Sequence, residues 1–192
     1  MAVYVDPLTV IDYFYPDSPL RTLLLQHSTQ VCNKALSIAA AAPGVAVDME
    51  TVRIGAMLHD IGIGHCHAPA IYCVGDAHYI AHGTLGADML RQYGAIHQLD
   101  LEIYSLICER HTGSGITAAE VVSQKLPIAV KDYLPLSNEE KLIALADKFF
   151  SKSGDLQEKP LGQVRKSMIR FGEASLNRFD DLCRLFGVKD EN

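Results

Sequence analysis

Apolar residues recur at helical spacing along most of this chain, and no segment shows the strict alternation that predicts a half-buried β-strand. One apolar stripe, for example, runs from Leu20 through Leu24 and Val31 to Ile38. A helix with such a stripe buries it against another element, here against other helices. With 192 residues, 48% of them hydrophobic, the chain can form one substantial core. The sequence therefore predicts an all-α fold, a single compact helical bundle over residues 1–192.

Capping residues and helix breakers give the expected boundaries. Pro7, Pro16 and Pro19 indicate an irregular opening, and Asp48 is a typical N-cap. The sequence SNEE at residues 137–140 has the form of a capping box, in which the serine and a glutamate satisfy free amides at a helix start. Helices are expected over about residues 20–42, 48–62, 80–93, 99–111, 137–150 and 161–186. Residues 66–79 are predicted to form a loop beside a site, and residues 118–136 have no clear pattern.

Charge and cysteine content exclude several classes of protein. The 17 basic and 23 acidic residues give a net charge of −6, which disfavours broad binding to nucleic acid or to an anionic membrane. No apolar run approaches the roughly 20 residues of a membrane-spanning helix, and the first residues lack a signal-peptide pattern. The five cysteines are scattered without a CxxC pair, as expected for buried thiols. We therefore expect a cytoplasmic protein that binds neither nucleic acid nor membrane.

Eight histidines, in a chain without tryptophan, are the main sign of chemistry. His59 and Asp60 are adjacent in the sequence HDIG at the end of an apolar helix, and together they offer a nitrogen and a carboxylate ligand. An isolated His-Asp pair is more often structural. Here, however, His27 interrupts the inward stripe of an earlier helix, and Asp147 lies within a strongly apolar helix. A carboxylate buried there requires a charged partner or a metal ion.

The order His27, His59-Asp60, Asp147 resembles the metal-binding signature of the HD-domain superfamily of metal-dependent phosphohydrolases. HDIG is the motif that names a large subset of that superfamily. The resemblance covers about residues 20–152 and extends to His82 in AHGTLGA and His111 in ERHTG. Residues 132–150 are also similar to the end of small HDIG phosphohydrolases and to HD-type diadenosine tetraphosphate hydrolases. The resemblance implies a metal-binding core over about residues 20–152, followed by a C-terminal helix over about residues 161–186.

This resemblance also implies a ligand set for two divalent or transition-metal ions. His27, His59 and Asp147 would hold one ion, His82 and His111 the other, and Asp60 would bridge them. Nitrogen and carboxylate ligands suit iron or manganese first, with nickel, cobalt and zinc as alternatives. The implied reaction is hydrolysis of a phosphoester or phosphoanhydride of a small molecule, such as a nucleotide or dinucleotide, by a metal-bridging hydroxide.

Basic residues near these ligands are candidates for binding substrate phosphate. They are Arg110, Lys148 and Lys152. An equally good interpretation is that they complement helix dipoles and face solvent. Many HDIG proteins have a lysine just after the motif, where this chain has Ile63, Gly64 and His65. The remaining candidates are rim residues, namely His65, His67 and His78.

Three other functions remain open at this level. The same six-ligand pattern supports an HD-type diiron oxygenase, or a non-catalytic metal-dependent regulatory module, and the histidines could also be purely structural. His78 and His82, four residues apart, form an alternative metal pair. The apolar stripe of the last helix is expected to face the core or a homodimer partner, and a role as a lid has no support in the sequence.

Overall fold

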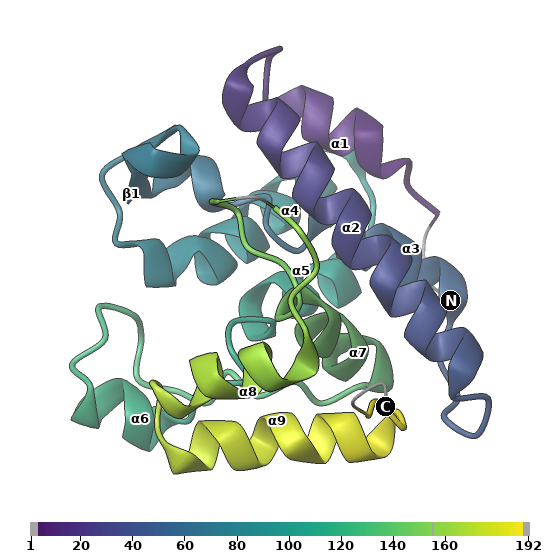
Figure 1. The fold of residues 1–192 in the computed structure, drawn as a ribbon. Helices are drawn as coiled ribbons and strands as arrows, with labels where there is room; N and C mark the ends of the chain where they lie inside the picture. Colours follow the sequence, from purple (N-terminus) through teal and green to yellow (C-terminus); the bar gives the residue numbers. More distant parts are fainter. Residues whose placement is uncertain (1–3, 155, 190–192) are drawn as a thin grey trace.

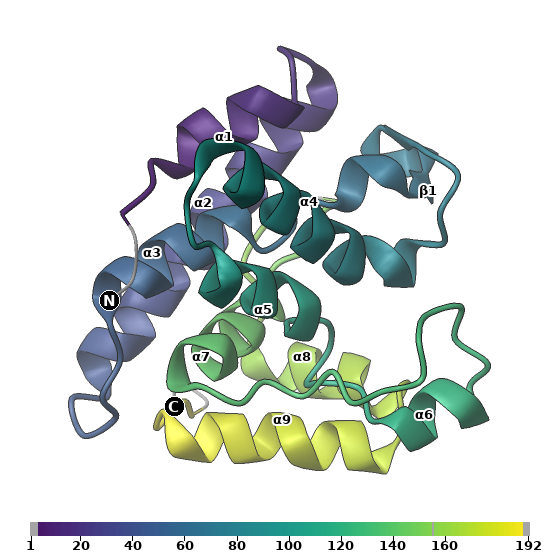
Figure 2. The same ribbon diagram turned by 180° about the vertical axis from the view of Figure 1, so that it is seen from behind.

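The computed structural model describes residues 4–154 and 156–189. Within these residues its regular secondary structure is helical apart from one two-stranded ribbon (Figures 1 and 2). The α-helices are α1 (Pro7–Phe14), α2 (Pro19–Ala41), α3 (Met49–Leu58), α4 (His82–His97), α5 (Glu102–Arg110), α6 (Ala118–Ser123), α7 (Asn138–Asp147), α8 (Leu161–Ile169) and α9 (Glu173–Leu185). The predicted all-α class is confirmed. No helix in the described part of the chain is long and apolar enough to span a bilayer.

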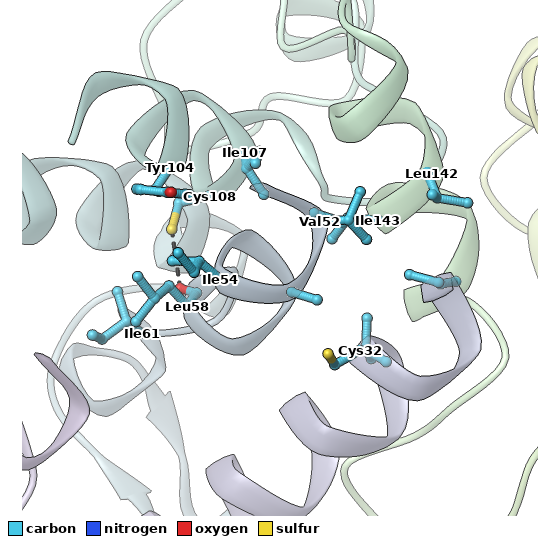
Figure 3. Close-up of a cluster of buried hydrophobic side chains, with 14 of the residues drawn as sticks. Cys32, Val52, Ile54, Leu58, Ile61, Tyr104, Ile107, Cys108, Leu142 and Ile143 are labelled. Carbon is cyan, nitrogen blue, oxygen red and sulfur yellow. Dashed lines mark hydrogen bonds between the residues drawn. The ribbon is translucent and has the colours of Figure 1, made fainter. Parts of the chain in front are cut away.

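Helix α3 lies at the centre of the bundle, in contact with α2, α5 and α7. Its residues Val52, Ile54 and Leu58 are fully buried among side chains of these neighbours (Figure 3). Gly55 allows the close approach, because a Cβ there would lie only 2.5 Å from Cδ1 of Ile107. The end of α3 is thus buried among the other central helices.

Short elements connect the central helices. Three 3₁₀ turns, η1 (Ile63–His65), η2 (Pro69–Ile71) and η3 (Tyr79–Ala81), lie between α3 and α4. Within the predicted loop 66–79, β1 (His67–Ala68) pairs with β2 (Cys73–Val74) in antiparallel register, His67 opposite Val74. This two-residue ribbon is too short to produce an alternating sequence pattern.

The opening residues are helical, contrary to the sequence-based expectation. Pro7 occupies the first turn of α1, where its missing N–H costs nothing. The Asp6 carboxylate caps this turn by accepting hydrogen bonds from the amides of Leu8 and Thr9. Two of the three prolines that suggested an irregular segment therefore mark helix starts, since Pro19 likewise begins α2, whereas Pro16 lies between the two helices.

Two of the predicted caps are formed. Asp48 accepts a hydrogen bond from the amide of Thr51, and Ser137 accepts one from the amide of Glu140. The second half of the SNEE capping box is absent, because the Glu140 carboxylate accepts hydrogen bonds from Leu136 N and from Arg110. A complete capping box starts α6 instead, in the segment without a clear sequence pattern, between Thr117 and Glu120.

The predicted C-terminal helix over residues 161–186 is in fact two helices, α8 and α9. The break lies at Gly172, which adopts a φ of +102° that side-chain-bearing residues rarely tolerate. Apolar periodicity continued across the break, so the sequence pattern did not reveal it. The stripe packs within the chain, where Phe179 of α9 is fully buried and Met168 of α8 nearly so.

Replacing Gly62 by Ala is expected to lower the free energy of unfolding by about 3 kcal/mol, the upper end of typical overpacking costs. A Cβ at Gly62 would clash with backbone atoms of His82 and Gly86, which cannot move aside as flexible side chains can. Chemical denaturation measures the effect. Gly162→Ala is the matched control, because a Cβ there meets nothing within 4 Å. Equal stability of the two variants would show that α4 does not pack tightly on the HDIG turn.

Candidate metal centre

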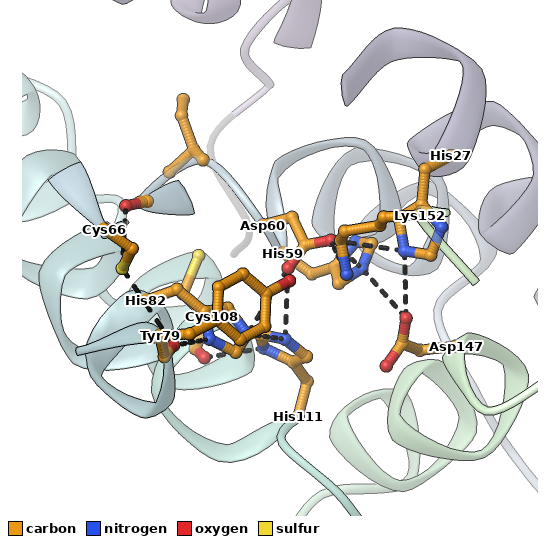
Figure 4. A network of polar contacts seen from close by, with 12 residues as sticks. His27, His59, Asp60, Cys66, Tyr79, His82, Cys108, His111, Asp147 and Lys152 are labelled. Atoms are coloured by element: carbon orange, nitrogen blue, oxygen red, sulfur yellow. Dashed lines mark hydrogen bonds and ion pairs between the residues drawn. The ribbon is translucent and has the colours of Figure 1, made fainter. Parts of the chain in front are cut away.

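Six of the predicted site residues converge on one buried point (Figure 4). They come from four helix ends, the HDIG turn and the interior of α2. All have side chains at most a few per cent exposed: His27, His59, Asp60, His82, His111 and Asp147. Residues separated by up to 120 positions in sequence are thus brought within hydrogen-bonding distance, as His27 and Asp147 are. Their predicted role as metal ligands is a separate question, which depends on how their donor atoms are oriented.

Three of the four histidines are oriented by the same local device. His59 follows α3, His111 follows α5 and His82 follows η3, so each ring lies at the C-terminal end of a helical turn. In each case the ring Nδ1 lies 2.6–2.7 Å from the carbonyl oxygen three residues earlier. A carbonyl can only accept, so Nδ1–H donates and the hydrogen bond fixes the tautomer. The lone pair of each Nε2 is then free to bind an electrophile.

Asp60 lies between two groups of donor atoms. Its Oδ2 is 3.2 Å from Nε2 of both His27 and His59, while its Oδ1 is 3.4 Å from Nε2 of both His82 and His111. Asp147 completes the first group, with Oδ1 2.9 Å from His27 Nε2. The ligand atoms within each group all lie within 4.8 Å of one another.

The separations between donor atoms suit metal coordination. Two ligands bound at about 2.1 Å lie roughly 3.0 Å apart at a right angle and roughly 3.4 Å apart at a tetrahedral angle. The observed contacts of 2.9–3.6 Å lie within about 0.2 Å of these two values. In addition, Asp60 Oδ1 is buried without a hydrogen-bond partner among the described residues and has only ion-pair contacts with His82 and His111. Such an acceptor fits a bound cation.

The closest contact within the second group is the strongest sign of this fit. Nε2 of His82 and Nε2 of His111 lie 3.0 Å apart. Each ring already carries its proton on Nδ1, so in the neutral tautomers two lone pairs face each other. Burial lowers the pKa of His82 to about 3 and lowers that of His111 as well, which keeps both rings neutral. A cation between the two nitrogens and Asp60 would relieve the repulsion.

The first group is more strongly charged. Burial disfavours ionisation of Asp60 and Asp147, but nearby cations, with Lys152 foremost for Asp60 and Lys148 for Asp147, hold both pKa values well below the usual range. Burial likewise lowers the pKa of His59, yet the two carboxylates outweigh it and raise this pKa to about 9. The two carboxylates also raise the pKa of the buried Lys152 against the effect of desolvation. Both carboxylates of the first group therefore stay ionised, and each has a lysine beside it.

Two of the three predicted phosphate-binding residues lie at this centre. Lys152 Nζ is 2.6 Å from Oδ2 of Asp60, and Lys148 Nζ is 2.6 Å from Oδ2 of Asp147. Arg110 does not reach it. Its guanidinium pairs with Glu140 at 3.1 Å and links α5 to α7, so the structure gives it a place between helices rather than at the site.

The centre opens into a cavity of about 590 Å³ between the metal-ligand groups and helices α6, α8 and α9. His82, His111 and Asp147 line its inner end. Its walls include residues that the sequence did not single out: Tyr79, Thr112, Lys159, Met168, Phe171 and Arg178. Tyr79 stacks on the His82 ring with centroids 4.7 Å apart. Except for Thr112 in ERHTG, these residues follow no motif, and they reach the cavity through the packing of η3 and of the segments around α8 and α9.

The remaining predicted histidines lie apart from the donor groups. His78 is exposed, lines the cavity, and uses Nδ1 to accept a hydrogen bond from the amide of Ile80. His82 faces His111 instead of His78, so the alternative pair on one helical turn is not formed. His65 and His67 are exposed and lie outside the cavity lining.

Comparisons with known proteins identify the domain family of the chain. The model of the HD-domain family matches residues 24–151. An uncharacterised protein of Methanocaldococcus jannaschii is 40% identical over 126 residues, 65% of this chain and 64% of that protein. The tRNA (cytidine(56)-2'-O)-methyltransferase of Picrophilus torridus is 36% identical over 129 residues, 67% of this chain but 32% of that enzyme. That of Thermoplasma volcanium is 34% identical over 128 residues, again 32% of the enzyme.

The chain therefore matches less than two thirds of the length of each of these relatives. Among solved structures, the HD domain of a phosphodiesterase from L. monocytogenes is similar with a TM-score of 0.49 and 14% identity, over 96% of this chain and 97% of that one. The match to the family model covers all six converging residues and most of the chain. On that match, the chain belongs to the HD-domain superfamily of metal-dependent phosphohydrolases, as its sequence motifs indicate.

Proposed function

We propose that this chain hydrolyses a phosphoester or phosphoanhydride of a small molecule, with two divalent ions held by the six converging residues. One observation carries this proposal above the others: the opposed lone pairs of His82 and His111, 3.0 Å apart beside Asp60. A purely structural histidine pair would share a proton at this distance. The donor set fits a cation there, and the first group offers three more ligand atoms, from His27, His59 and Asp147, around the other Asp60 oxygen.

When bound, a pair of divalent ions supplies Lewis-acid stabilisation of phosphoryl oxygens and a source of hydroxide near neutral pH. The side chains of this protein would bind and orient the substrate. His59, His82 and His111 are held in one orientation by their Nδ1–H hydrogen bonds, so little reorganisation accompanies substrate binding. Lys152 Nζ lies against the carboxylate shared by the two groups, where it can bind an equatorial phosphoryl oxygen.

The phenol of Tyr79 lies beside the same centre. Burial raises the pKa of the Tyr79 hydroxyl, so this hydroxyl stays protonated at neutral pH. A protonated phenol in the cavity wall can donate a hydrogen bond to the substrate. Together with Lys152, it would orient the phosphoryl group against the metal-ligand groups.

A nucleotide is the substrate class that the cavity supports. Its volume of about 590 Å³ is far larger than inorganic phosphate requires and lies within the range of small-molecule sites. Its lining includes the apolar side chains of Ile116, Met168 and Phe171. Such a surface can accept a nucleobase or another flat apolar group. The methyltransferase relatives act on tRNA, but the net charge of −6 disfavours a broad contact between this chain and RNA.

Metal removal and restoration tests the proposed function. Protein stripped by a chelator is expected to release no phosphate from a panel of nucleotides and simple phosphoesters, and added Mn²⁺ or Fe²⁺ is expected to restore the activity. Metal content, measured in parallel by mass spectrometry, should rise to two ions per chain. A loaded protein that releases no phosphate from any member of the panel would contradict the proposal. Oxygen consumption by that protein would instead indicate an oxygenase.

A further inference from the structure

The segment between α7 and α8 brings three lysines to the cavity. We call its described residues, 148–154 and 156–160, the lysine strap. Lys148, Lys152 and Lys159 all line the cavity. Two of them contact carboxylates of the metal-ligand groups, whereas no carboxylate of the described residues forms an ion pair with Lys159. Lys159 is therefore a cation in the cavity wall that is not paired with any ligand of the proposed metal centre.

The lysine strap is held in place from both sides. Lys159 N donates a hydrogen bond to Phe149 O at 2.8 Å, and Lys159 Nζ donates one to Phe150 O at 3.1 Å. On the outer side, Gln30 Nε2 of α2 donates to Leu156 O at 2.8 Å, and Lys34 of α2 pairs with Glu158 at 2.5 Å. Binding of a ligand by the strap lysines would therefore cost little conformational entropy, because the backbone of the segment is already held in place.

The charges that face the cavity are unbalanced. Its acidic lining residues, among those that the structure describes, are Asp147 and Glu120, and Glu120 is paired with Arg178 at 2.8 Å. Burial lowers the pKa of Lys159, and the positive charges of Lys148 and Lys152 lower it further against the attraction of Asp147. Bound divalent ions would neutralise Asp60 and Asp147 and leave the strap cations in excess. A single phosphate dianion carries too little charge to balance them.

We propose that the substrate carries two phosphate groups, one at the metal-ligand groups with Lys152 and the second bound by Lys159 with Lys148. This inference rests on the proposed function and narrows it to a substrate class. The two phosphates can be joined in a phosphoanhydride or carried on separate hydroxyls of one nucleoside. A water oxygen attacks one phosphorus atom, and a new P–O bond forms as the bond to the leaving oxygen breaks. The proton lost by water passes to the leaving oxygen when that oxygen belongs to a hydroxyl, and to solvent when the leaving group is a phosphate anion.

Lys159→Gln tests this inference, because Gln keeps a donor for Phe150 O but removes the charge. For ADP and adenosine 3',5'-bisphosphate, kcat/KM of the metal-loaded variant is expected to fall about 10- to 100-fold, the size of one charge-assisted contact. For AMP it should stay within about twofold. Calorimetry gives a second readout, since the Kd of the α,β-methylene analogue of ADP should rise by the same factor. Lys159→Arg should retain most of the affinity.

Lys166→Gln is the matched control, since Lys166 is an exposed lysine of α8 outside the cavity lining. It should leave every rate and Kd unchanged. A preference for ADP or for the bisphosphate would tell how the two phosphates are linked, and either result supports the inference. Equal kcat/KM for AMP and both two-phosphate nucleotides, or an equal loss on all three in Lys159→Gln, would overturn it while leaving the proposed function intact. Failure of the proposed function is different: no metal-dependent phosphate release from any phosphoester.

Discussion

Replacing Asp60 by Asn is expected to abolish both the tight binding of two metal ions and the hydrolytic activity. Asn keeps the shape of the side chain but loses the charge, and its amide NH₂ cannot act as a ligand. The two donor groups contact different oxygens of Asp60, and Asn has only one side-chain oxygen. Residue 60 could then provide a ligand to only one of the two groups. The loss in kcat/KM should be at least about 10³-fold, because removing one preorganised transition-state contact already costs about 10²–10³.

Metal analysis and kinetics of the purified variant measure these effects. Circular dichroism and thermal unfolding of Asp60→Asn, compared with chelator-treated wild type, separate a loss of metal from a loss of fold. A variant that binds two ions and keeps more than about a tenth of the activity would show that Asp60 does not bridge. That outcome would mean that the two ions are held without a shared ligand, although Asp60 is the one residue common to both donor groups.

Replacing His82 by Ala is expected to remove one ion and leave the other. His82 belongs to the group of three, whereas the group of His27, His59, Asp60 and Asp147 is left complete. About one ion per chain should remain after dialysis, and kcat should fall by roughly 10²–10³. His111→Ala should give the same result, because its Nε2 faces the same point. Metal stoichiometry by mass spectrometry is the deciding measurement.

His78→Ala is the control for this pair, since His78 lies four residues away, is exposed and belongs to neither donor group. It should retain two ions and a kcat within about threefold of wild type. If His82→Ala also retained two ions, the proposed second site would be wrong. If it retained none, the two groups would act as one site instead of two.

Much of the candidate site could be predicted from the sequence because its residues stand out against apolar helices. Asp147 is a carboxylate within a buried helix, and His59-Asp60 ends another, so each demands a partner. The family resemblance supplied His82 and His111, which the residues alone could not assign. Helix ends such as Asp48 and Ser137 followed from side chains that compete for free amides. These signals depend on a few neighbouring residues, so a single sequence is enough to detect them.

What could not be predicted depends on packing between distant segments. Arg110 was a phosphate-binding candidate by its position beside His111, but Glu140, 30 residues away, pairs with it. Lys159 and Tyr79 belong to no motif, and they reach the cavity because the segments around α8 and η3 fold against its walls. The break at Gly172 left the apolar period intact, so only the backbone geometry reveals it. Sequence periodicity predicts which side of a helix is buried, but it does not predict which other segment packs against that side.

Anomalous X-ray scattering from crystals of the protein loaded with Mn²⁺ tests the central claim most directly. The account predicts two peaks about 3.5–4 Å apart on either side of the Asp60 carboxylate. One peak should lie beside His27, His59 and Asp147, and the other between His82 and His111. A single peak, or peaks away from Asp60, would contradict the two-ion centre on which the proposed hydrolysis rests.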